Sequence, residues 1–243
     1  MSTFGGPGIV IGSNLVFSLD AGNIKSYPGS GITWYDKSGN NFNGTLCNLI
    51  TYDSSKFGNL VFNGTSSMIT IPNTTRLIWS ASGVVGNSNM SIDIWVKTTD
   101  LGGYIYSKPW NGSGQYNIQL SHNGFRLMCG ASGTTISDLA FTSIATGNWV
   151  NIVFWMSSTQ QGCYINGTQS STTISHGLSG DVPTSGNSSE KTALMTLYPY
   201  GEGWGGNSGF SITGNLSICR VYDRVLTASE VLQNYNSTQT RFN

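Results

Sequence analysis

Short apolar runs, separated by clusters of Gly, Asn, Ser and Pro, recur along the whole chain. The runs are rich in the β-branched and aromatic residues that β-strands favour. Turn signals such as Asn63-Gly64 and Asn123-Gly124 lie between them, because Asn and Gly both tolerate positive φ. The pattern therefore predicts many strands joined by tight turns. The clearest runs cover residues 14–20, 60–62, 68–71, 91–96, 149–156, 162–166, 210–212 and 216–222.

Only one segment predicts a helix, and it lies at the C-terminal end. Thr227 and Glu230 have capping-box spacing, so their side chains can bind free amides at a helix start. Apolar residues then form one short face, which places the helix near residues 228–235. Many strands without interleaved helices predict an all-β fold of two packed antiparallel sheets, either a sandwich or a jelly roll, with this short C-terminal helix. No composition break or repeat divides the chain, so we expect a single domain over residues 1–243.

Charged residues make up only 9% of the 243 residues and the formal net charge is zero, against about 25% charged residues in ordinary globular proteins. A neutral surface gains little by releasing counterions, so nucleic acid is not an expected partner. The chain has no polybasic run, so contact with an anionic membrane is not expected. It also has no apolar segment long enough to span a membrane, so insertion is not expected. The N-terminus lacks the features of a signal peptide, so we expect synthesis in the cytoplasm.

Cysteines and strand tryptophans are expected in the core. The cysteines are widely spaced and form no CxxC pair, so we expect free thiols. Trp95, Trp149 and Trp155 lie inside strand patterns and are predicted as core residues. The four cysteines are Cys47, Cys129, Cys163 and Cys219.

Five stretches resemble, in order, the laminin-G-like jelly roll of the concanavalin A-like lectin/glucanase superfamily. The resemblance implies the same fold over nearly the whole chain, although this fold hosts lectins, hydrolases and structural modules alike. The run Gly5-Gly-Pro-Gly-Ile-Val10 is also similar to proteins of tailed phages, which implies a virion surface component. The stretches are residues 15–46, 60–72, 90–96, 147–167 and 214–235.

The residues of a hydrolase on this fold are missing. Glycoside hydrolysis needs two carboxylates on one face of a strand, about 5 Å apart in retaining enzymes. Glu190, Glu202 and Glu230 have no acidic residue within four positions, and Glu230 is assigned to the helix cap. His122 and His176 are the only imidazoles and are interpreted as loop or surface residues. We therefore expect no catalytic residue and no enzymatic activity.

A Gly-rich loop is the candidate ligand-binding site. Sugars present flat C–H faces and rings of hydroxyls, so a sugar site combines aromatic rings with amides and carboxylates. The alternative is that the same aromatic residues only fix their loops to the sandwich. The candidate residues are Tyr198, Tyr200, Glu202, Trp204 and Asn207, with Trp110 in a second loop.

Calcium is the one candidate metal, although no cofactor is required by the expected function. Many members of the wider family bind calcium through carboxylate and backbone oxygens. Asp20 and Asp36 match acidic positions of the opening motif, so the resemblance implies a candidate site there. The alternative is that both carboxylates cap turns.

The sequence thus predicts a non-enzymatic surface protein of a tailed-phage virion, either a capsid decoration or a tail-fibre module. Its expected partners are other virion proteins and, through weak binding, a host-surface glycan. Many copies on a particle would make weak single-site affinity sufficient. One alternative is a structural cement protein without sugar affinity, and a second is a glycoside hydrolase or lyase on the same fold.

Overall fold

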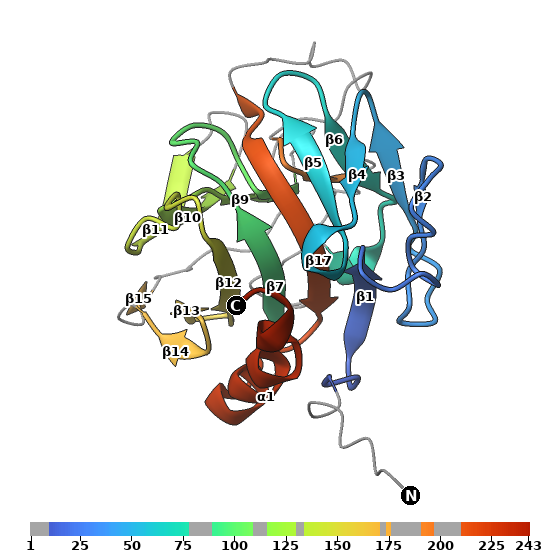
Figure 1. Ribbon diagram of the computed structural model, residues 1–243. Helices are drawn as coiled ribbons and strands as arrows, with labels where there is room; N and C mark the ends of the chain where they lie inside the picture. The colour runs from blue at the N-terminus through green and yellow to red at the C-terminus, as the bar shows by residue number, and fades with distance from the viewer. Residues whose placement is uncertain are drawn as a thin grey trace, which may run out of the picture.

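Two antiparallel sheets face each other in the computed structural model, and one α-helix lies against the outer face of one sheet (Figure 1). This architecture confirms the predicted jelly-roll sandwich. The structure describes residues 10–77, 89–108, 116–129, 134–170, 174–175, 191–196 and 210–243.

Nine of the described strands form the first sheet, in the order β14-β13-β12-β7-β17-β5-β4, with β1 beside β17 and β15 beside β13. The last strand of the chain, β17, lies between β7 and β5, so the sheet closes only when the C-terminal segment is in place. The bounds are β1 (Leu15–Asp20), β4 (Thr51–Asp53), β5 (Asn59–Asn63), β7 (Met90–Lys97), β12 (Trp149–Met156), β13 (Gln160–Ile165), β14 (Thr168–Gln169), β15 (Ile174–Ser175) and β17 (Thr213–Tyr222).

Eight described strands form the second sheet, in the order β11-β10-β9-β8-β16-β6-β3-β2. Short 3-10 helices lie at Ser55–Phe57, Thr75–Leu77 and Gln239–Arg241. The strand bounds are β2 (Thr33–Trp34), β3 (Gly44–Cys47), β6 (Met68–Ile71), β8 (Tyr106–Lys108), β9 (Tyr116–Leu120), β10 (Gly124–Cys129), β11 (Thr134–Ala140) and β16 (Thr192–Leu194).

The main core lies between the sheets and follows the alternation of strand side chains. In β7, Ile92, Ile94 and Val96 face the core and are fully or almost fully buried. Phe125 of β10 stacks on Phe154 of β12, with ring centroids 3.3 Å apart and planes 11° apart. This stack joins the two sheets directly.

The helix α1 (Ala228–Thr238) creates further buried clusters on the outer face of the first sheet. Trp95 is buried there, its ring stacked on Tyr235 and Phe242 at centroid distances of 5.7 and 4.1 Å. The prediction that Trp95 is a core residue is confirmed. Trp149 and Trp155 are only half-buried, because both lie at the margins of these outer clusters instead of between the sheets.

The predicted capping box is present at the start of α1. The Thr227 hydroxyl accepts a hydrogen bond from the Glu230 amide at 3.3 Å, and the Thr227 amide donates to the Glu230 carboxylate at 2.9 Å. Arg224 also donates to Glu230 at 2.7 Å. The helix continues to Thr238, three residues beyond the predicted end, because its buried residues Asn234 and Thr238 bind the sheet.

A buried ion pair lies beneath the helix. Asp93 accepts hydrogen bonds from Arg220 at 3.1 Å, Asn151 at 2.8 Å and Asn234 at 3.2 Å, and Asp93 and Arg220 are almost fully buried. Asn234 in turn accepts from the Ile11 amide at 2.9 Å. The network therefore joins three adjacent strands, the helix and the N-terminal segment.

Three of the expected free thiols are present. Cys163 and Cys219 are buried and Cys47 is half-buried, and none of them forms a disulfide. Burial raises the pKa of the Cys219 thiol far above its ordinary value. The side chain of Cys129 is not among those that the structure describes. In the part of the chain that the structure describes, no helix is long and apolar enough to cross a membrane.

Removing one partner of the buried ion pair tests its role. We expect Asp93→Ala to lower the free energy of unfolding by about 3–5 kcal/mol, because it leaves the Arg220 guanidinium buried without its counter-charge. Chemical denaturation measures the loss. The control Asp53→Ala removes a half-buried carboxylate that binds Ser55 of the adjoining turn, and it should cost less, about 0.5–2 kcal/mol. The double variant Asp93→Leu, Arg220→Met should lose less than Asp93→Ala alone; a larger loss would contradict this account.

The helix cap predicts a pH dependence. The hydrogen bonds from Arg224 lower the pKa of Glu230 from 4.5 to about 2. Because the folded-state value is below the unfolded one, the stabilisation is present above pH 4.5 and disappears as the pH falls through about 2. The difference in melting temperature between wild type and Glu230→Gln should therefore shrink across this range. A difference that stays constant down to pH 2 would show that the carboxylate charge contributes nothing.

Candidate functional site

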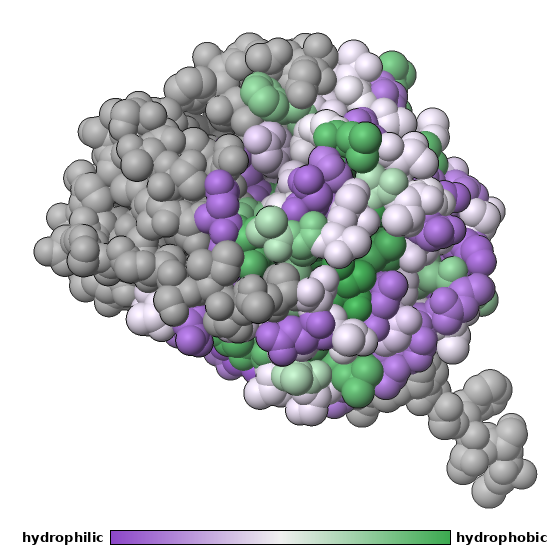
Figure 2. Space-filling model, turned by 90° about the vertical axis from the view of Figure 1, so that its left-hand side faces the viewer, coloured by the Kyte–Doolittle hydropathy of each residue, from purple (hydrophilic) through white to green (hydrophobic). Residues whose placement is uncertain are grey.

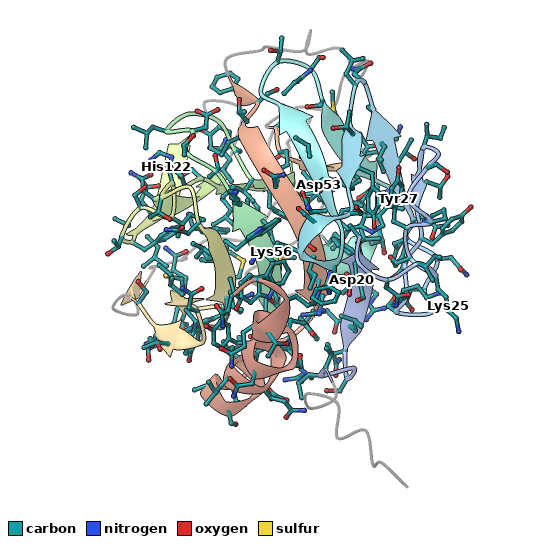
Figure 3. All side chains as sticks on the ribbon, viewed as in Figure 1. Asp20, Lys25, Tyr27, Asp53, Lys56 and His122 are labelled. Atoms are coloured by element: carbon teal, nitrogen blue, oxygen red, sulfur yellow. The ribbon has the colours of Figure 1, made fainter. Side chains whose placement is uncertain are left out.

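A pocket of about 440 Å³ opens at one end of the second sheet, where the β9–β10 turn meets the loop before β8. His122 marks this turn, on the side of the molecule away from β1–β3 (Figure 3). The volume is within the roughly 300–1,000 Å³ of small-molecule sites. The lining residues are Leu101, Gly103, Tyr104, Gln119, Ser121, His122, Asn123, Gly124, Phe125, Asp138, Leu139, Ala140 and Phe210.

Strand register brings polar side chains from separate strands to this pocket. Gln119 of β9 and Asp138 of β11 both lie opposite Arg126 of β10, so they belong to one cross-strand row. Gln119 is buried, whereas Asp138 is exposed. The neighbouring lining residue Phe125 faces the core, where it stacks on the other sheet. The pocket floor is therefore the rigid sandwich itself.

The β9–β10 turn presents an imidazole and an amide. The Ser121 amide donates to the Gly124 carbonyl at 2.8 Å, which closes the turn around His122 and Asn123. The carbonyls of these two residues accept hydrogen bonds from the amides of Ile144 at 2.8 Å and Phe141 at 3.0 Å. Segment 141–144 thus fixes the back of the turn, and His122 and Asn123 line the pocket.

The imidazole of His122 has unused hydrogen-bonding capacity. Its Nδ1 atom is buried and has no hydrogen-bond partner among the described residues. Burying a polar atom without a partner costs free energy, so such atoms are rare in folded proteins.

Aromatic rings form the opposite wall. Tyr104 and Phe210 lie with ring centroids 6.0 Å apart and planes tilted by 40°. The Tyr104 amide donates to the Phe210 carbonyl at 3.2 Å. Gly103, at φ 70°, leaves no room for a Cβ atom, which would lie 2.6 Å from the Ser211 carbonyl oxygen. The loop that carries Tyr104 therefore packs directly against the segment that leads into β17.

Asp100 fixes the loop that carries Tyr104. Its carboxylate accepts from the Gly102 amide and from the Thr213 amide, both at 2.9 Å. The loop is therefore tied to the first residue of β17. The site is built from rigid elements on two sides, which favours a preformed pocket.

The lining can bind a ligand with both apolar faces and hydroxyl groups. Aromatic rings, an amide, an imidazole and a hydroxyl converge on it. Among the described lining residues, Asp138 is the one carboxylate and there is no Lys or Arg. These groups suit a polar ligand that carries hydroxyls.

The loops singled out in the sequence lie outside the described residues. This holds for Tyr198, Tyr200, Glu202, Trp204 and Asn207, for Trp110, and for His176. His122 was expected on a loop or at the surface, and no sequence pattern predicted that it lines a pocket. Its turn was marked by Asn123-Gly124, but nothing local shows that this turn meets Tyr104 and Phe210.

Asp36 is a structural brace. Its buried carboxylate accepts hydrogen bonds from the amides of Ser18 and Ser38, both at 2.8 Å. It also accepts from the Ser38 hydroxyl at 2.7 Å and the Phe42 amide at 3.1 Å. The bond from Ser18 ties the loop after β2 to β1, and the other three brace that loop, so a cation would have to displace protein donors.

Asp20 is also engaged by the protein. Its carboxylate accepts from Arg241 at 2.9 Å and from the Gly22 amide at 2.9 Å, which ties the end of β1 to the C-terminus. Among the residues that the structure describes, no three or more His, Cys, Asp or Glu side chains form a group able to hold a metal ion. In this structure Asp36 therefore stabilises a loop, and Asp20 binds the C-terminal segment to the end of β1.

Two of the solved structures with the same fold are binding domains of toxins. The chain superposes on the binding domain of Paraclostridial Mosquitocidal Protein 1 with a TM-score of 0.66 and 17% identity, over 93% of this chain and 52% of that one. For the binding domain of botulinum neurotoxin DC, solved with rat synaptotagmin II, the values are 0.64, 15%, 94% and 52%. The chain thus spans about half of each toxin domain.

A third similar structure matches at nearly full length. It is domain 4 of AbnA, an extracellular arabinanase of Geobacillus stearothermophilus, solved in complex with arabinotriose. The TM-score is 0.62 and the identity 22%, over 91% of this chain and 98% of that one. At such identities these similarities show the fold alone.

The family assignment comes from the sequence. No curated protein sequence matches the chain significantly. The profile of the Laminin_G_3 family, described as the concanavalin A-like lectin/glucanases superfamily, matches residues 63–232, which is more than half of the chain. The protein therefore belongs to the Laminin_G_3 family of concanavalin A-like domains.

Proposed function

We propose that this protein is a carbohydrate-binding module that holds a neutral oligosaccharide in the His122 pocket and catalyses no reaction. The observation that carries the proposal is the lining of this pocket. It combines the aromatic wall of Tyr104 and Phe210 with the imidazole of His122 and the polar groups of Gln119 and Asp138. Sugar rings stack on aromatic faces, and their hydroxyls bind amides, imidazoles and carboxylates.

The carboxylate count of the pocket supports binding without hydrolysis. Most glycoside hydrolases use one carboxylic acid and one carboxylate on opposite sides of the scissile bond. Among the described lining residues, Asp138 is the single carboxylate. A glycoside bound to these residues would meet one acidic group instead of a pair.

The arabinanase domain supports the choice of a neutral ligand. It has the same fold over nearly its whole length and was solved with arabinotriose, an uncharged trisaccharide. An uncharged sugar also avoids repulsion from Asp138. The binding domain of botulinum neurotoxin DC has the same fold and was solved in complex with a protein, rat synaptotagmin II. The fold can therefore also bind protein ligands.

We further propose that the module is displayed on the surface of a tailed-phage particle and binds host glycan there. The support is the resemblance of the run Gly5–Val10 to phage proteins. A particle carries many copies, so weak binding at each pocket adds up to firm attachment. The rival is a structural cement role, which predicts no sugar affinity in the test below.

Titration with neutral oligosaccharides tests the proposed site. The probes are linear arabino-, xylo- and cello-oligosaccharides, and calorimetry measures their affinity. We expect His122→Ala and Asp138→Asn to weaken binding at least tenfold, about 1.4 kcal/mol, because each removes a hydrogen-bonding group from the pocket. The free energy of unfolding should change by less than about 1 kcal/mol, since both positions are partly exposed.

The matched control is Asp53→Asn, which removes the same charge from β4 at the other end of the sandwich (Figure 3). It should leave the affinity unchanged. Equal weakening by all three substitutions would place the sugar elsewhere. Absence of binding by the wild-type protein to every probe would leave the structural cement role.

Calcium binding at Asp20 and Asp36 is the alternative to the structural roles of these two carboxylates, and a melting experiment separates the two. We expect millimolar calcium to leave the melting temperature unchanged relative to EDTA, because protein donors already occupy the Asp36 oxygens and Arg241 pairs with Asp20. A calcium-dependent rise that disappears in Asp36→Asn would instead establish a metal site.

A further inference from the structure

We infer that the protein has a second carbohydrate subsite, which binds further units of the same oligosaccharide; this inference rests on the proposed function. The site is a pocket of about 430 Å³ between the loop after β11 and the β13–β14 hairpin. Its volume is similar to that of the His122 pocket and within the roughly 300–1,000 Å³ expected of a small-molecule site.

The floor of this second pocket is apolar and firmly held. Ile144 and Val150 belong to the buried core, and Ile165 packs against that core. Trp149 lies at the side of the pocket, half-buried, with its ring 4.9 Å from that of Phe242 at 46°. A sugar ring can place its C–H face on such a floor, and the indole is an aromatic wall in a fixed position.

The rim of the pocket offers free hydrogen-bonding groups. Asn148 and Gln169 are both exposed at the pocket, and neither side-chain amide forms a hydrogen bond within the described part of the chain. The indole N–H of Trp149 likewise has no partner among those residues. Each amide supplies two donors and one acceptor, which suits vicinal sugar hydroxyls.

The charge of the pocket selects the class of ligand. The described side chains that line it are all uncharged, and the polar ones are hydroxyls and amides. These groups offer no cation to a phosphate or a carboxylate, and no carboxylate to a cation. On the described part of the face in Figure 2, hydrophobic and hydrophilic residues lie interspersed. A neutral, hydroxyl-rich and partly apolar ligand fits these properties.

One short segment separates the two pockets. Ala140 lines the His122 pocket and Thr142 lines the second pocket. Two residues of extended chain span roughly 7 Å. The same segment binds the β9–β10 turn through the Ile144 amide and the His122 carbonyl, 2.8 Å apart. Segment 140–144 therefore adjoins both pockets, and we infer that an oligosaccharide laid across this segment contacts both.

The geometry thus predicts that affinity depends on chain length. A single sugar unit fills only the first pocket, whereas a chain of several units gains contacts in the second. In titrations with linear arabino-, xylo- and cello-oligosaccharides of one to six units, we expect at least one series to gain tenfold in affinity from the shortest to the longest member. In nitrogen–proton NMR spectra, the Trp149 indole resonance should shift only with the longer members.

Substitutions separate this inference from the proposed function. The double variant Asn148→Ala, Gln169→Ala should remove the gain with chain length and leave the affinity for the shortest binding member within twofold. Trp149→Phe retains the ring against Phe242 and should remove part of the gain. His122→Ala should weaken every length. The matched control is Gln233→Ala, Asn236→Ala on the exposed face of α1, which should change nothing.

The outcomes are distinct. If His122→Ala weakens binding but the Asn148, Gln169 double variant leaves the length dependence unchanged, the second subsite is wrong and the proposed function stands. If the double variant weakens all lengths equally, the sugar binds only in the second pocket, and the two-pocket arrangement is wrong. If no oligosaccharide shifts any resonance of either pocket, both proposals are wrong.

Discussion

The buried pair of Asp93 and Arg220 is the constraint on which the remaining structure depends. Removing two charges from water costs several kcal/mol per ion, so the pair is tolerable only because amides of Asn151 and Asn234 complete its hydrogen bonds. These partners come from adjacent strands and from α1. The fold can therefore satisfy the pair only when β17, β7, β12 and the helix are all in place. Helix position and sheet order are thus set together.

The helix position has consequences for the binding surface. With α1 and the C-terminus in place, Trp95 and Phe242 stack on the outer face of the sheet, and Phe242 fixes the ring of Trp149. Trp149 then forms the side of the second pocket. On the other sheet, the Phe125–Phe154 stack fixes the floor of the first pocket. Both candidate sites are therefore extensions of the core. Because their side chains are already ordered, ligand binding costs less conformational entropy.

The shortage of charge shapes the chemistry of both pockets. With 9% charged residues, most of the polar surface consists of hydroxyls and amides. In the described part of the chain, Arg76, Arg220, Arg224 and Arg241 pair with carboxylates of the same chain. Apart from the Asp138 carboxylate, the described lining of both pockets offers neutral hydrogen-bonding groups and apolar contact. Such interactions discriminate by shape, and they give modest affinity at each site, which suits multivalent display.

The sequence by itself determined the local features, because these depend on neighbouring residues. Strand alternation, the Asn-Gly turns and the Thr227–Glu230 cap are short-range patterns, and they sufficed for the jelly-roll class and the single C-terminal helix. Ordered motifs also sufficed for the family. Only the tertiary structure decided that β17 lies at the sheet centre, that Trp149 and Trp155 face outward, and that the β9–β10 turn meets Tyr104 and Phe210. These facts follow from contacts between segments far apart in the chain, which no local pattern encodes.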